Sequence, residues 1–285
     1  MTPLFHRRAT RVALVLLAAA CTRTPAQPPS TTVTITASDF AFAAPDTIPA
    51  GQVTLRLVNA GKELHHAVLV RLGEGKTVAD FGAGMQEMMQ RPGPPPPWIS
   101  FPGGPNAVDA ADTAVVTVIL DAGQYVLICV IPSADGVPHV AKGMMRPLVV
   151  AGRVPAPAPE PATDNVLTLS DYDFQLREPL TAGAHVLRVE NAGQQAHEVV
   201  LAELAPGKSV RDFVAWEMGG EKGPLPTGRW RGGVAGLDQG RHATWAVTLP
   251  PGRYLLLCFW PDAHDGKPHL VHGMAKELTV QNRTS

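Results

Sequence analysis

The chain has 285 residues, a formal net charge of −1 and no cluster of Lys or Arg in its expected folded part. Binding to nucleic acid therefore has no electrostatic support. Pro (28 residues) and Gly (27 residues) are abundant enough for a turn-rich β protein, but not so abundant as to predict a disordered chain.

The first 21 residues are expected to be an export signal. A basic segment precedes the apolar run 12–20, which is too short to span a bilayer as a helix. Cys21 follows directly, in a pattern that resembles the lipobox of bacterial lipoproteins, where this Cys is lipidated after cleavage. We expect export to the periplasm or outer cell envelope, a lipid anchor in the membrane through Cys21, and a flexible tether over 22–32. Simple cleavage at Ala18-Ala19-Ala20 is the alternative.

Most of the remaining chain consists of two copies of one unit. Residues 34–70 match 167–201, KTVADF matches KSVRDF further on, and both copies close on a similar loop that contains Cys. We therefore expect two domains, over 33–150 and 165–281, each long enough to bury a core. The Pro/Ala-rich join over 151–164 is expected to be a semi-rigid spacer.

Each repeat shows short runs of alternating apolar residues separated by Gly, Pro and Asn turns, which favours an all-β sandwich. The expected strands are 32–37, 53–59, 66–72, 114–120 and 125–130, then 185–191, 198–203, 244–249 and 254–259. Period two places Tyr125, Leu127 and Cys129 on one inward face. Thr77 with Asp80, and Ser209 with its Asp three residues later, resemble capping boxes that open one short inserted helix per repeat.

The three Cys residues are distributed in an informative way. Cys21 belongs to the signal, which leaves Cys129 and Cys258 at equivalent positions of the two repeats. A disulfide between them is possible in an exported protein, but it would require strands of separate domains to meet. A lone Cys in each domain suggests a metal ligand or an inert core residue.

The loop after each Cys carries a set of soft and borderline metal ligands. In the first repeat Cys129 is followed by His139 and Met144, and in the second repeat the equivalent residues are Cys258, His269 and Met274. A thiolate, an imidazole and a thioether suit copper above all. Each residue alone also fits a structural role, as a buried core Cys, a turn His or a core-filling Met.

Both repeats resemble the small blue-copper proteins, the cupredoxins such as plastocyanin. The segments NAGKELHH and NAGQQAHE supply an upstream His65 and His197, and the later loops supply Cys, His and Met in the family's order. The resemblance implies two tandem Greek-key β-sandwiches, each with a type 1 copper site made of His65, Cys129, His139 and Met144, or of His197, Cys258, His269 and Met274. It departs from plastocyanin in one respect: nine or ten residues, rather than two, separate the Cys from the following His.

Other candidate ligands are expected to have structural roles. Strand alternation predicts that His66 faces solvent, opposite to His65, and His264 is expected at the surface. Met85, Met88 and Met89 lie on the expected helix and are assigned to helix packing.

The sequence supports three functions. The first is an exported, membrane-anchored copper protein that transfers electrons or handles copper, with an unidentified redox or copper-exchanging protein as its partner. The second is a metal-free cupredoxin-like binding module of the cell envelope. A two-domain copper oxidoreductase is less favoured, because the His-x-His and His-Cys-His motifs of a second copper type are missing from the sequence.

Overall fold

The structure is a computed structural model that describes residues 31–90, 95–152, 159–220 and 222–282. The expected export signal with Cys21, most of the tether, and residues 153–158 of the spacer lie outside the described residues. Within the described ranges, no helix is both long and apolar enough to cross a membrane.

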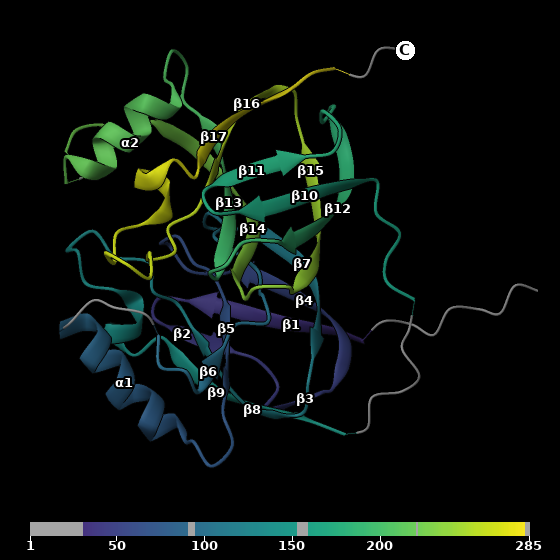
Figure 1. The fold of residues 1–285 in the computed structure, drawn as a ribbon, viewed down its shortest axis with the longest axis vertical. Helices are drawn as coiled ribbons and strands as arrows, with labels where there is room; N and C mark the ends of the chain where they lie inside the picture. Colours follow the sequence, from purple (N-terminus) through teal and green to yellow (C-terminus); the bar gives the residue numbers. More distant parts are fainter. Residues whose placement is uncertain (1–30, 91–94, 153–158, 221, 283–285) are drawn as a thin grey trace, which may run out of the picture.

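The first repeat is a sandwich of two sheets (Figure 1). One sheet has the order β2-β1-β4-β7 and the other has the order β3-β9-β8-β5-β6. The strands are β1 (Thr31–Ser38), β2 (Ala41–Ala43), β3 (Thr47–Pro49), β4 (Gly51–Asn59), β5 (Val68–Leu72), β6 (Ile99–Ser100), β7 (Thr113–Leu120), β8 (Gly123–Ile128) and β9 (Met145–Ala151). Helix α1 (Val78–Gln90) follows β5, and the short 3-10 helix η1 (His139–Lys142) precedes β9.

The second repeat has the same plan. Its sheets have the orders β11-β10-β12-β15 and β14-β13-β16-β17. The strands are β10 (Asn165–Ser170), β11 (Asp173–Leu176), β12 (Gly183–Asn191), β13 (His197–Leu204), β14 (Thr227–Leu237), β15 (His242–Leu249), β16 (Gly252–Leu257) and β17 (Ala275–Val280). Helix α2 (Val210–Met218) follows β13, and η2 (His269–His272) precedes β17. The expected all-β sandwich with one short helix inserted in each repeat is confirmed.

Alternation of apolar side chains explains why these segments form strands. In β4 every second residue is buried, because its apolar positions face the core and its polar positions face out. Tyr125 and Leu127 lie on one buried face of β8, and Cys129 comes one residue after that strand ends, also fully buried. The Cys is therefore an inward-facing residue held by the edge of a rigid sheet.

The two repeats join along a sheet. Strands β7 and β15 occupy equivalent positions in their repeats and pair antiparallel, with Thr117 opposite Thr244. This pairing joins the sheet β2-β1-β4-β7 of the first repeat to the sheet β11-β10-β12-β15 of the second, which gives one sheet of eight strands. A second seam pairs the segment 101–108 with β14 through bridges such as Pro105 to Val234. The middle segments, which diverge most between the repeats, thus form the second of these two contacts.

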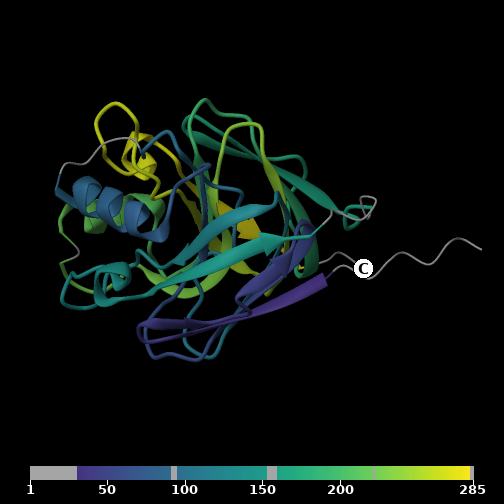
Figure 2. The same ribbon diagram turned by 90° about the horizontal axis from the view of Figure 1, so that it is seen from below.

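Both inserted helices begin with a complete capping box. The Ser209 hydroxyl accepts a hydrogen bond from the Asp212 amide, and the Asp212 carboxylate accepts one from the Ser209 amide. Thr77 and Asp80 form the same reciprocal pair in front of α1. The helices lie on the same side of the molecule (Figures 1 and 2), and residues from both line an apolar cavity of about 600 Å³ between the repeats.

Candidate metal centres

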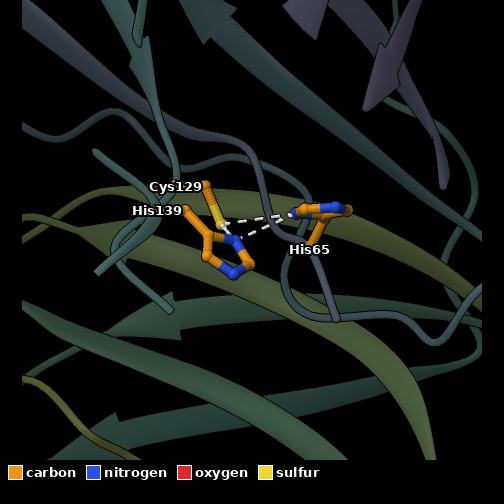
Figure 3. A group of neighbouring side chains, drawn as sticks. All are labelled: His65, Cys129 and His139. Atoms are coloured by element: carbon orange, nitrogen blue, oxygen red, sulfur yellow. Dashed lines mark hydrogen bonds between the residues drawn. The ribbon is translucent and has the colours of Figure 1, made fainter. Parts of the chain in front are cut away.

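The first repeat brings three of its predicted ligands together (Figure 3). His65 lies between β4 and β5, Cys129 follows β8, and His139 opens η1. The Sγ atom of Cys129 lies 3.4 Å from His139 Nδ1 and 4.0 Å from His65 Nδ1, and the two Nδ1 atoms are 3.1 Å apart. All three residues are fully buried.

The second repeat has the same cluster with almost the same dimensions. Cys258 Sγ lies 3.5 Å from His269 Nδ1 and 4.0 Å from His197 Nδ1, and the two Nδ1 atoms are 2.9 Å apart. These residues are also fully buried. The two repeats, which lie far apart in the sequence, thus have the same arrangement of donor atoms.

The triangle of donor atoms has the size that a metal ion needs. Sides of 3.1, 3.4 and 4.0 Å, or of 2.9, 3.5 and 4.0 Å, define a point about 2.1 Å from all three atoms. Imidazole nitrogen and thiolate sulfur bind zinc at about 2.0–2.3 Å, which brackets this value. Each cluster therefore fits an ion bound trigonally by two imidazoles and one thiolate, the donor set of blue-copper sites.

Proton counting in the first cluster also favours a cation. His65 Nε2 lies 2.8 Å from an Asp39 carboxylate oxygen, and His139 Nε2 lies 3.0 Å from a Glu63 carboxylate oxygen. A neutral ring that donates through Nε2 turns its Nδ1 lone pair inward. Two lone pairs and one sulfur then converge with at most one thiol proton between them. A bound cation resolves this excess of acceptors, in the carboxylate–histidine–metal arrangement common in metalloproteins.

The second cluster shares one carboxylate contact and differs in the other. His197 Nε2 lies 2.5 Å from Asp171, as His65 does from Asp39. The nearest carboxylate oxygen to His269 Nε2 is on Asp262, 3.7 Å away, which is too long for a hydrogen bond. That oxygen instead accepts hydrogen bonds from the Tyr172 hydroxyl and from the side chain of Gln195. His269 Nε2 is buried without a hydrogen-bond partner among the described residues.

The long spacing between Cys and His closes on itself. In the first repeat Pro132 and Pro138 form an isolated β-bridge, and the His139 amide donates to the Ile131 carbonyl. The loop turns at Gly136, whose φ of 76° suits glycine. In the second repeat Pro261 pairs with Pro268 in the same way. The inserted residues are a small looped-out turn, so they return each His to its Cys.

The Asn-Ala-Gly segments position the upstream histidines. The Asn59 side chain donates to the carbonyl oxygens of Glu63 and Val108 and accepts from the Gly61 amide. A Cβ atom on Gly61 would lie 2.3 Å from the Asp39 carboxylate and 2.7 Å from His65 Nε2. Gly193 is equally confined beside Asp171 and His197 in the second repeat. Glycine is required at this position because the Asp–His pair passes directly over it.

The predicted methionine ligands lie beside these clusters. The Met144 amide donates to the His139 carbonyl, and the Met144 carbonyl accepts from the Cys129 amide. Met274 makes the same two contacts, with His269 and Cys258. Both methionines are fully buried. Their backbone contacts hold them next to the ligand loop.

Burial controls the protonation of the clusters. Burial raises the pKa of the Cys129 thiol to about 12 and raises the pKa of Cys258 as well. Burial also lowers the pKa of His65 and His197, against the opposing effect of their Asp partners, and lowers the pKa of His269 to about 4. At neutral pH these imidazoles are therefore free to bind a metal, whereas each thiol must lose a proton first.

The prediction that His66 faces solvent is wrong. His66 is only 5% exposed, and its counterpart Glu198 only 6%. Strand alternation does turn His66 away from His65, but that opposite face is covered by Val130 and by Asn106, which lies in the segment that pairs with the other repeat. Burial lowers the pKa of His66 to about 4 and raises the pKa of Glu198 to about 7.

The other predicted residues are accounted for as follows. His264 is exposed, as expected. Met85 packs against a buried apolar cluster and Met88 lines the cavity, but Met218 is 60% exposed and packs little. Cys129 and Cys258 are both free thiols, in agreement with the disfavoured disulfide.

The carboxylates around the histidines were not predicted. Asp39 and Asp171 lie at the same position of the matched segments, and this repetition of an acidic turn residue was a usable signal. Glu63 and Asp262 carried no such signal, because they come from different elements of the two repeats. Glu63 corresponds to Gln195, and Asp262 corresponds to a Ser, so the acidic residue has changed places.

Comparisons with known proteins gave matches among solved structures. No protein-family model matches the chain, and no curated protein matches it. A dithionite-reduced auracyanin from the photosynthetic bacterium Roseiflexus castenholzii is similar at 24% identity, over 44% of this chain and 100% of its own, with a TM-score of 0.30. Auracyanin A from Chloroflexus aurantiacus, described as a "blue" copper protein, matches at 21% identity over 43% and 100%, with a TM-score of 0.30.

A larger protein matches across both repeats. The copper-containing nitrite reductase from Thermus scotoductus is similar at 12% identity, over 90% of this chain and 62% of its own, with a TM-score of 0.23. Because these TM-scores are low, the class of the fold rests on the strand order and on the ligand clusters. The chain has a tandem cupredoxin-like fold, with one candidate ligand set in each repeat.

Proposed function

We propose that this protein binds one copper ion in each repeat and carries electrons one at a time. His65, Cys129 and His139 would hold the first ion, and the equivalent residues of the second repeat would hold the other. Met144 and Met274 would each supply a weak thioether ligand to the ion beside them, completing the donor set of a type 1 site. The observation that carries the proposal is the convergence of three donor atoms to within 4.0 Å in both repeats.

Electron transfer fits the clusters better than exchange of copper with another protein. A bound copper ion would supply two stable oxidation states. The chain supplies buried ligands whose positions are fixed by the hydrogen bonds that His65 and His197 donate to Asp39 and Asp171, and by the backbone of the sandwich. A site that is fixed in this way changes little when its charge changes, whereas a site for metal exchange needs exposed ligands.

A copper oxidoreductase is less well supported. Besides the two His/Cys/His clusters, the described residues contain a third group that could hold a metal ion. It comprises Asp262, Asp265 and His272, and two of these three residues are exposed. This cluster contains one histidine, whereas the second copper ion of such enzymes needs several histidine ligands. The metal-free binding module stays the alternative, and it predicts a protein that does not bind copper.

The cellular setting is also part of the proposal. The basic and apolar segments before Cys21 support export and lipidation, which would place the copper centres outside the cytoplasm at a membrane surface. An unidentified redox protein is the proposed partner. Mass spectrometry of the mature protein should show an acylated N-terminal Cys21, and a protein cleaved there without added lipid would contradict the anchor.

Titration with Cu(II) tests the metal proposal. The intact protein should bind two equivalents and develop an intense visible band from thiolate-to-copper charge transfer. The double variant Cys129→Ser/Cys258→Ser should lose this band while it keeps its fold by circular dichroism. A native protein that binds no copper, and whose melting temperature is unchanged by it, would favour the metal-free module.

A further inference from the structure

A buried chain of three side chains connects the two candidate centres. The Val130 amide donates to His66 Nε2 at 2.9 Å, so the His66 proton lies on Nδ1, which faces Asn106 Oδ1 at 3.4 Å. The Asn106 amide group then donates to Glu198 Oε2 at 3.0 Å, and Glu198 Oε1 accepts from the Phe259 amide at 3.1 Å. Val130 follows Cys129, and Phe259 follows the Cys of the other repeat.

Both ends of this bridge also contact the thiols directly. The amide of Glu198 donates to Cys258 Sγ at 3.5 Å, and the amide of His66 donates to the Cys129 thiol. Each of these two residues therefore holds its Cys through the main chain and holds the following amide through its side chain. Asn106 joins them, and each of the three residues is at most 6% exposed.

The central residue comes from the seam between the repeats. Asn106 lies in segment 101–108, which pairs with β14, and its amide nitrogen also contacts the carbonyls of Val199 and Val234 in the second repeat. The equivalent position in the second repeat is Ala235, and the equivalents His66 and Glu198 differ in type. A symmetric pair of repeats could not form this bridge, because it needs one end that donates to the Asn106 oxygen, another end that accepts from the Asn106 nitrogen, and a single amide between them.

We propose that His66, Asn106 and Glu198 couple the two centres, so that loading one with metal raises the affinity of the other. This inference rests on the proposed function, because it requires both clusters to bind metal. A thiolate accepts a stronger hydrogen bond than a thiol does, so loading tightens the contact to the bridge residue beside it. The bridge then orders the equivalent loop of the other repeat, which has less freedom to lose when its own metal binds.

Native mass spectrometry at half saturation with Cu(II) measures this coupling. The informative quantity is the squared singly loaded population divided by the product of the empty and doubly loaded populations. Positive coupling keeps this ratio low. In Asn106→Leu the ratio should rise roughly fivefold or more, the usual size of coupling between linked sites. Asp238→Ala is the matched control. The Asp238 carboxylate accepts a hydrogen bond from the Phe101 amide across the same seam, but it does not contact the bridge.

A second variant and a metal-free measurement complete the test. Glu198→Gln should raise the same ratio, and hydrogen exchange of the metal-free Glu198→Gln protein should be faster at the Val130 amide in the other repeat. A ratio that is unchanged in both bridge variants, or exchange that changes only in the second repeat, would overturn the coupling. A chain that binds no copper at all would instead overturn the proposed function, and the coupling with it.

Discussion

The two ligand clusters share their three donors but support the loop histidine differently. His139 donates to a carboxylate of Glu63, which comes from the segment before the upstream histidine. Within the part of the chain that the structure describes, His269 has no such partner, because Tyr172 and Gln195 hold the carboxylate of Asp262 3.7 Å away from it. A ring neighbour also differs, with Phe40 packed on His139 and Tyr172 packed on His269.

This difference separates what the fold requires from what it allows. The donors, the looped-out turn and the Asp contact to the upstream histidine occur in both repeats, so they define the site. The second carboxylate has moved between elements, so it adjusts the site. We expect the first centre to bind copper more tightly, since an acidic partner raises the basicity of a histidine ligand and fixes its ring.

The largest effect is expected from removing one thiol at a time. Cys129→Ser should abolish the charge-transfer band of the first centre, and Cys258→Ser that of the second, because a hydroxyl does not replace a thiolate as a copper ligand. Each variant should keep about half of the visible band and bind one equivalent of copper. A band that disappears completely in one variant and persists fully in the other would show that only one repeat has a centre.

The next effect concerns the shared Asp contacts. Asp39→Asn and Asp171→Asn should each weaken copper binding at their own centre by roughly 10- to 100-fold, because the ring loses a charged partner. Competition with a chelator, read by the visible band, measures this loss. Equal binding in either variant would show that the carboxylate has no part in the site.

Exchanging the second partner tests the asymmetry itself. Glu63→Gln should weaken the first centre by about tenfold and make it resemble the second. Gln195→Glu places the carboxylate in the second repeat at the position of Glu63, and it should strengthen that centre. If both substitutions change affinity in the same direction, the comparison of the two centres is wrong.

The buried thiols predict a pH dependence of the metal-free protein. The pKa of Cys129 is near 9.0 in an unfolded chain and about 12 when buried, so the unfolded state loses its proton first. Stability is therefore fully present below pH 9 and falls between pH 9 and 12, by about 1.4 kcal/mol per pH unit for each thiol. Urea unfolding of the native chain and of Cys129→Ser should show a shallower fall in the variant. Identical pH profiles would mean that the thiol is not buried in the protonated form.

The smallest effect is expected at the helix caps. Thr77→Ala and Ser209→Ala each remove a capping-box hydroxyl, which should lower the free energy of unfolding by about 1 kcal/mol. The visible band of the copper-loaded protein should stay unchanged, because the two hydroxyls form hydrogen bonds with the Asp residues of their own caps, away from the ligand atoms. A changed band in either variant would link the inserted helices to the centres.

The sequence predicts the strands well and indicates the candidate ligands for a local reason. Alternation within β4 or β8 follows from one buried face, and Cys129, His139 and Met144 occur at spacings that the chain repeats. The carboxylate of Glu63 could not be predicted, since its contact depends on how a loop folds over the histidine. The burial of His66 could not be predicted either, because alternation identifies a face but cannot say whether water or another repeat covers it. The pairing of segment 101–108 with β14 could not be predicted either, because the segment shows no regular alternation and its bridges depend on the other repeat.

X-ray absorption spectroscopy of the copper-loaded chain tests the central claim most directly. The average copper ion should have two nitrogen neighbours from imidazole and one short sulfur neighbour, with two ions bound per chain. In Cys129→Ser the loading should fall to one ion per chain, which should keep its short sulfur contact. Copper surrounded only by nitrogen and oxygen, or loading that does not depend on the two cysteines, would contradict the assignment of both centres.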